Sequence, residues 1–178
     1  NYISFIMQTT APYTHCIIFL HGLGDTSSGW SFLPNVLPTF PQRNILYHFP
    51  NAPTDKVTCN GGMSMTSWFD IINIPVDQNE PDTPKGCMES ASNIHTIISS
   101  ISRTHNIPST SIILGGFSQG GAMSILAGST YPTPLCGIIC MSGWCLQKSN
   151  TLPNLTTQGG TQYGTPIFVG HGGEDNIV

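Results

Sequence analysis

The chain has 178 residues, of which 39% are hydrophobic and 8% are charged, and its formal net charge is −4. This length gives room for one domain with a substantial core, so two complete domains are not expected. The five Lys and Arg residues are scattered, which argues against nucleic acid as a partner, and no apolar run approaches the ~20 residues that cross a bilayer, so at most transient membrane contact is expected.

Five apolar runs are predicted to form the strands of one sheet. They cover residues 16–20, 45–49, 111–114, 135–141 and 166–169. Runs that are apolar throughout are typical of parallel strands, because both faces of such a sheet are covered. The sequence therefore predicts a buried, mostly parallel sheet.

Two helices are predicted between these strands. Apolar side chains recur at three- and four-residue intervals over residues 88–101, which predicts an amphipathic helix that begins near Thr83 and ends at Asn106. A shorter helix is predicted over residues 119–129, where glycines and alanines allow close packing. Residues 50–66, rich in Pro, Asn and Gly, are expected to form a long loop. Alternating strands and helices predict an α/β fold with helices on both faces of the sheet.

The strongest chemical signal is a G-x-S-x-G pattern at residues 116–120, between a predicted strand and a predicted helix. In a nucleophile elbow, a strained turn holds the serine hydroxyl above the sheet, and the glycines let neighbouring backbone pass closely. The pattern predicts Ser118 as the nucleophile of an α/β-hydrolase fold. The alternative is a glycine-rich turn without a catalytic role.

A nucleophilic serine needs a histidine base and a carboxylate that orients it, in the chain order Ser, acid, His for this fold. Asp175 follows the fifth predicted strand and is the predicted acid, with Glu174 as its nearest competitor and a solvated turn carboxylate as the alternative. No histidine follows Asp175. The other histidines have simpler explanations. His95 and His105 are expected at the surface, His48 in the core, and His21 and His171 in turns after strands. We therefore expect the base to lie outside these residues.

The oxyanion that forms during acyl transfer needs two preorganised N–H donors. The backbone N–H of Gln119 is one candidate, because it follows the nucleophile directly. The backbone N–H of Leu23, in the loop 21–25 after the first strand, is the other. The alternative for this loop is a simple turn capped by Asp25.

These residues resemble the acyl-protein thioesterase and carboxylesterase family, also called lysophospholipase-like serine esterases. The resemblance rests on four motifs in order: His21-Gly22-Leu23-Gly24-Asp25-Thr26 with Gly29-Trp30, Ser67-Trp68-Phe69-Asp70, residues 113–122, and His171-Gly172 with Asp175 and Val178. It implies that Ser118 is the nucleophile, Asp175 the acid, and the Leu23 and Gln119 amides the oxyanion hole. It also places Trp68 near the acyl site, with a core aromatic as the equal alternative.

The same resemblance implies a base in a Gly-x-x-His-type segment after the acid, followed by a final strand and helix. The chain does not contain this segment, and it begins with Asn1 rather than Met. We therefore expect a single α/β-hydrolase domain over residues 1–178, truncated at its C-terminus and incomplete at its N-terminus. Such a fragment is expected to be inactive by itself.

The expected activity is hydrolysis of acyl esters or thioesters, above all of palmitoyl thioesters on proteins. The alternatives are a broad carboxylesterase or lysophospholipase with the same machinery, and a truncated, non-catalytic chain that binds acyl groups. Expected partners are thus acyl-thioester or acyl-ester substrates, including S-acylated proteins or lysophospholipids.

The cellular location and the need for a cofactor are predicted from the N-terminal segment, a glycosylation triplet and the cysteines. The apolar segment 2–7 lacks a positively charged flank and an A-x-A site, so no signal peptide is expected and the cytoplasm is the default location. A glycosylation triplet at Asn154 does not change this, because such triplets arise readily by chance. The six cysteines contain no C-x-x-C pair and are expected to be reduced. No metal or cofactor is expected.

Overall fold

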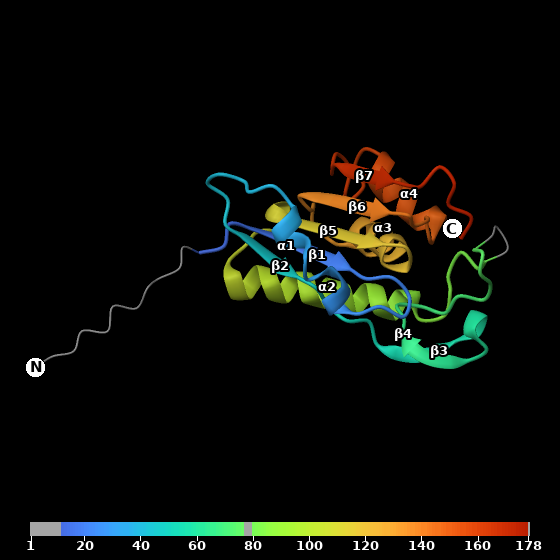
Figure 1. The fold of residues 1–178 in the computed structure, drawn as a ribbon. Helices are drawn as coiled ribbons and strands as arrows, with labels where there is room; N and C mark the ends of the chain where they lie inside the picture. Colours follow the sequence, from blue (N-terminus) through green and yellow to red (C-terminus); the bar gives the residue numbers. More distant parts are fainter. Residues whose placement is uncertain (1–11, 77–79, 178) are drawn as a thin grey trace, which may run out of the picture.

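The computed structural model describes residues 12–76 and 80–177, and its centre is a parallel sheet of five strands (Figure 1). The strands lie in the order β2-β1-β5-β6-β7, and every neighbouring pair is parallel. The predicted strands are confirmed, with ends that shift by one to three residues, and so is the α/β fold. The strands are β1 (His15–Leu20), β2 (Ile45–His48), β5 (Ile112–Phe117), β6 (Gly137–Met141) and β7 (Ile167–Gly170).

Both predicted long helices are present and pack together. They are α2 (Cys87–His105) and α3 (Gln119–Thr130). α2 ends at Asn106, which adopts a left-handed φ of 54°, a conformation that asparagine tolerates at helix ends. α3 packs on β1, β5 and β6. A Cβ at Gly128 would lie 2.7 Å from the side chain of Ile138, so glycine permits this close approach to β6.

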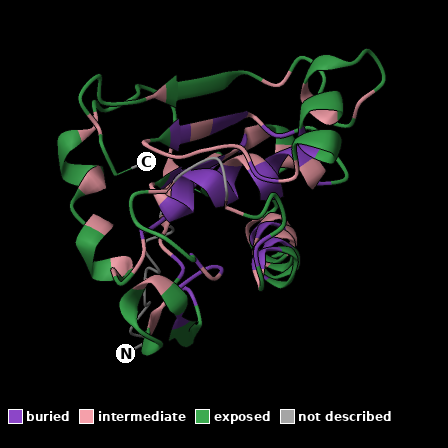
Figure 2. Cartoon of the chain, turned by 90° about the vertical axis from the view of Figure 1, so that its right-hand side faces the viewer, coloured by how far each residue is buried: buried purple, intermediate pink, exposed green. Residues whose placement is uncertain are grey.

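The remaining helices are short. Figures 1 and 2 place α1 on the side of the sheet opposite α2 and α3, so helices lie on both faces, but very unequally. One face is covered by two long helices and the other by two short ones, at residues 27–30 and 33–36, with their flanking loops. The short helices are η1 (Ser27–Trp30), α1 (Leu33–Val36), η3 (Ser109–Ser111) and α4 (Lys148–Thr156).

Residues 50–66 contain a hairpin where a loop was predicted. Two antiparallel strands, β3 (Thr54–Val57) and β4 (Met63–Thr66), form a small separate sheet. The 3-10 turn η2 (Thr58–Asn60) and left-handed glycines at 61 and 62 connect them. The loop prediction was wrong here because these strands are short and mostly exposed, with only Val57 buried, so the sequence shows no apolar alternation.

The core lies between the sheet and the two long helices, and β7 forms an exposed edge. Ile167, Phe168 and Val169 of β7 are 41%, 60% and 60% exposed, and Figure 2 shows this outermost strand mostly in the colour of exposed residues. The six cysteines are free thiols, as predicted. Among the described residues, no helix is both long and apolar enough to cross a bilayer. The segment 1–7 and Val178, used in the sequence analysis, lie outside the described residues.

Candidate active site

Ser118 occupies the sharp turn between β5 and α3. Its φ of 52° and ψ of −120° lie outside the regions that non-glycine residues normally adopt, as expected for a strained nucleophile elbow. Two backbone hydrogen bonds hold the turn: the Ser118 N–H donates to the Met141 carbonyl at 2.8 Å, and the Ala122 N–H donates to the Ser118 carbonyl at 3.0 Å. The side chain is half-buried, so the hydroxyl is held at the surface of a rigid turn.

The two glycines that flank the serine are required by close backbone contacts. A Cβ at Gly116 would lie 2.1 Å from the carbonyl oxygen of Gly120. A Cβ at Gly120 would lie 2.3 Å from the carbonyl oxygen of Leu20 in β1. Real Cβ atoms do not approach backbone this closely, so the strand, turn and helix predicted from the G-x-S-x-G pattern need both glycines.

The strand register brings three loops to the same edge of the sheet as Ser118. Leu20 at the end of β1 pairs with Gly116, and Phe117 at the end of β5 pairs with Met141. Met141 in turn pairs with Gly170 at the end of β7. The loops after β1 and β6 therefore start beside the elbow, and the loop after β7 starts at the same edge, one strand beyond β6. Carboxyl ends of parallel strands are where ligand sites collect in open α/β sheets.

The loop after β1 lies directly against Ser118. A Cβ at Gly22 would lie 3.6 Å from the Ser118 Cβ, which places the neighbouring Leu23 amide close to the elbow. Within the described part of the chain, neither the Leu23 N–H nor the Gln119 N–H donates a hydrogen bond. The capped turn weighed as the alternative is also present, because Asp25 accepts the Thr26 N–H at 2.7 Å.

The side chain of Gln119 ties the elbow to the segment after β4. Its carboxamide is buried, accepts the Trp68 N–H at 3.0 Å, and donates to the Ser67 hydroxyl at 2.9 Å and the Phe69 carbonyl at 2.6 Å. The Trp68 indole N–H donates to the His21 carbonyl at 2.9 Å. These bonds join the elbow, the loop after β1 and residues 67–69 into one buried network. Sequence reasoning missed this role of the Gln119 side chain, because a single glutamine gives no pattern.

Trp68 is a core residue of this network. Only 3% of it is exposed, and its ring packs 5.3 Å from the His21 ring, measured between centroids. This position supports the core alternative from the sequence analysis. A contact between Trp68 and substrate stays a prediction.

His21 serves the backbone, as expected from its His-Gly turn. The Ala52 N–H donates to Nε2 at 3.0 Å, so the ring hydrogen sits on Nδ1 and donates to the Gly22 carbonyl at 2.7 Å. The residue is 1% exposed. Both ring nitrogens are therefore occupied, and His21 has no lone pair available to accept the Ser118 proton.

Two other histidines differ from their sequence-based interpretation. His95, expected at the surface, is half-buried, with Nε2 2.8 Å from the Ala127 carbonyl of α3. His48, expected in the core, is half-buried on the edge strand β2. Burial lowers the pKa of His48, and repulsion from His105 lowers it further. In both cases, the sequence predicted the element correctly but not how far the histidine is buried within it.

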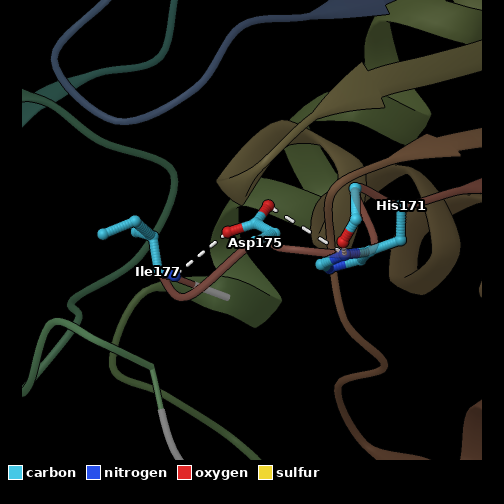
Figure 3. Close-up of polar contacts among 4 residues, drawn as sticks. His171, Asp175 and Ile177 are labelled. Atoms are coloured by element: carbon cyan, nitrogen blue, oxygen red, sulfur yellow. Dashed lines mark hydrogen bonds and ion pairs between the residues drawn. The ribbon is translucent and has the colours of Figure 1, made fainter.

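Asp175 lies in the loop after β7, at the edge that also carries Ser118. Its carboxylate accepts the Ile177 N–H at 3.0 Å, and its second oxygen lies 3.9 Å from Nδ1 of His171 (Figure 3). The Asp175 side chain is 20% exposed and that of His171 is 34% exposed. Glu174, the competing carboxylate, is exposed. The Val76 N–H donates to the Ile177 carbonyl at 2.8 Å and so ties this loop to residues 71–76.

The parallel sheet, the strained serine turn after its central strand and the loops gathered at the carboxyl edge define an α/β-hydrolase. The whole chain, residues 1–178, matches the phospholipase/carboxylesterase family, and it therefore belongs to that family. This confirms the resemblance and the hydrolase class expected from the four sequence motifs.

Named relatives refine the class. The chain is 38% identical over 175 residues to acyl-protein thioesterase 1 of Schizosaccharomyces pombe, which covers 98% of this chain and 75% of that protein. It is 40% identical over 175 residues to acyl-protein thioesterase 1 of Saccharomyces cerevisiae, covering 94% and 73%. The crystal structure of Arabidopsis thaliana SOBER1 superposes with a TM-score of 0.80 at 30% identity, covering 93% of this chain and 77% of that one. The chain is thus a hydrolase of the esterase and thioesterase class.

Proposed function

We propose that this protein hydrolyses S-acyl thioesters on proteins, with Ser118 as the nucleophile. The observation that carries the proposal is the strained Ser118 turn beside two backbone N–H groups, of Leu23 and Gln119, that donate no hydrogen bond within the described part of the chain. The relatives named acyl-protein thioesterase 1 support the choice of an acyl thioester as substrate.

In the proposed reaction, the Ser118 hydroxyl attacks the thioester carbonyl as its proton passes to an imidazole base. The carbonyl oxygen becomes an oxyanion that accepts hydrogen bonds from the Leu23 and Gln119 amides. The tetrahedral intermediate collapses, the C–S bond breaks, and the thiol leaves with the proton from the base. Water then attacks the acyl-serine ester by the same route, releasing the fatty acid and restoring Ser118.

We propose Asp175 as the acid that orients the base. Two observations support it: the loop after β7 starts at the edge of the sheet that carries Ser118, one strand beyond β6, and the Asp175 carboxylate is better shielded than the exposed Glu174. A carboxylate in this position holds the imidazole in the correct tautomer and stabilises the imidazolium that forms.

We infer that His21, His95 and His15 are not the base. His21 uses both ring nitrogens on backbone groups, and His95 binds the Ala127 carbonyl. His15 begins β1 and so lies at the opposite edge of the sheet from Ser118. His171 is at the correct edge, but its Nδ1 faces Asp175 from a position four residues away in the same loop, and it is the internal candidate to test.

Comparing acyl chains tests the proposed function. The purified enzyme should hydrolyse a palmitoyl thioester faster than an acetyl ester in continuous assays that detect the released thiol or acid, and Ser118→Ala should abolish both activities. The family also includes phospholipases and carboxylesterases, so a preference for short esters or lysophospholipids would favour that second function. Unchanged hydrolysis by Ser118→Ala would contradict both functions.

A further inference from the structure

The loop that carries the Leu23 amide is held from outside by the hairpin β3–β4. Thr66, the last residue of β4, makes two hydrogen bonds to this loop. Its carbonyl accepts the Gly24 N–H at 2.8 Å, and its hydroxyl donates to the Asp25 carbonyl at 2.6 Å. Thr66 therefore binds the backbone of the two residues that follow Leu23, Gly24 and Asp25.

The side-chain hydrogen bonds of residues 25–27 act farther from Ser118. The Asp25 carboxylate accepts the Thr26 N–H and, at 3.1 Å, the Trp30 indole N–H, which fix the turn that follows. The Asn51 side chain accepts the Ser27 N–H at 2.6 Å. Within the loop, the Asp25 N–H donates to the Gly22 carbonyl at 3.2 Å and closes a turn around the Leu23–Gly24 peptide, with Gly24 in a left-handed conformation at φ 74°. Thr66 adds an external constraint on this turn, through the Gly24 N–H and the Asp25 carbonyl.

We propose that Thr66 is a positioning residue for the oxyanion hole, and this inference rests on the function proposed above. Thr66 touches no reacting atom; it fixes the peptide next to Leu23 so that the Leu23 N–H points at the developing oxyanion. An N–H donor contributes to rate only when it is already aimed where the charge develops. Loss of the Thr66 hydroxyl therefore weakens transition-state binding and leaves substrate binding unchanged.

The test compares three single variants in the purified enzyme. Thr66→Val removes the hydroxyl and keeps the branched shape that suits a strand, and it should lower kcat for a palmitoyl thioester on the order of 10-fold with KM unchanged. Thr66→Ser keeps the hydroxyl and should retain most of kcat. Thr54→Val is the matched control, because Thr54 pairs with Thr66 across the hairpin and is exposed. It should change neither constant.

A second readout separates positioning from a general structural effect. A trifluoromethyl ketone with the same acyl chain forms an oxyanion on Ser118, and Thr66→Val should weaken its binding by the same factor as kcat. A non-hydrolysable thioether analogue should bind equally well to both proteins. The inference is overturned if Thr66→Val keeps full kcat, if Thr66→Ser loses as much as Thr66→Val, or if ketone affinity does not follow kcat. Activity that survives Ser118→Ala would instead defeat the proposed function itself.

Discussion

Individual residues at the carboxyl edge have roles that their hydrogen bonds define. His21 lies in the loop next to Ser118, and both of its ring nitrogens bind backbone groups, which agrees with the turn role expected from its sequence. Asp175, the predicted acid, has a carboxylate that accepts a backbone N–H and faces an imidazole nitrogen at 3.9 Å. The hydrogen-bond partners therefore indicate a structural role for His21 and leave Asp175 as the candidate catalytic carboxylate.

The assignment of the acid leads to a prediction at the residue scale. In the active enzyme, Asp175→Asn should lower kcat by roughly 10⁴, because an amide favours the wrong histidine tautomer while it keeps the shape of the side chain. Steady-state hydrolysis of a palmitoyl thioester measures the effect. Glu174→Gln is the matched control and should retain activity. If the Glu174 variant lost activity and the Asp175 variant did not, the acid would be Glu174, and loss of activity in His171→Ala would identify His171 as the base.

At the scale of elements, the elbow depends on a segment that is distant in sequence. The Gln119 side chain binds three groups of residues 67–69, so the start of α3 and the segment after β4 hold each other in place. The Trp68 indole extends this link to the loop after β1 through the His21 carbonyl. The Ser118 turn, the loop after β1 and residues 67–69 are therefore one connected unit.

This connection predicts a loss of stability that is larger than a surface change would cause. Gln119→Met fills a similar volume but leaves the Trp68 N–H buried without a partner, and the Phe69 carbonyl keeps only the Ser67 hydroxyl as a donor, which should cost about 2 kcal/mol in the free energy of unfolding. Urea denaturation followed by tryptophan fluorescence measures this cost. Gln158→Met at an exposed position should change stability by less than ~0.5 kcal/mol. Equal stability of the two variants would show that the buried bonds are unimportant.

Elements with a strong local pattern could be predicted from the sequence, and those that depend on partners could not. The five strands and both long helices are apolar runs or apolar stripes, so local periodicity revealed them. The hairpin β3–β4 gave no such signal, because most of its side chains are exposed and its contacts are with the loop after β1. The elbow was predictable because glycine is required at Gly116 and Gly120. Thr66 and the Gln119 side chain were not, because each acts through backbone groups distant in sequence.

For the molecule as a whole, the unequal covering of the sheet is the main physical consequence of the fold. α2 and α3 bury one face, whereas the opposite face carries the short helices η1 and α1 with their flanking loops, and β7 leaves apolar side chains exposed at an edge. Exposed edge strands with apolar side chains favour pairing with another chain. We therefore expect the edge at β7 to favour self-association.

The exposed edge gives a prediction about solution behaviour. Phe168→Lys should increase the monomer fraction of the purified 178-residue chain, because Phe168 is 60% exposed on β7 and a lysine on an edge strand opposes pairing. Light scattering coupled to gel filtration measures the molar mass. Met63→Lys is a suitable control, because Met63 is 65% exposed on the hairpin, away from this edge. An equal gain in monomer from both variants would mean that β7 is not the associating surface.

The central claim is that Ser118 is an activated nucleophile, and covalent labelling tests it most directly. After brief exposure of the active enzyme to a fluorophosphonate, peptide mass spectrometry should locate a single adduct on Ser118. Ser118→Ala should abolish labelling, whereas Ser142→Ala, at the equivalent position after β6, should leave it intact. An adduct on another residue, or labelling of Ser118→Ala at the full rate, would contradict the account.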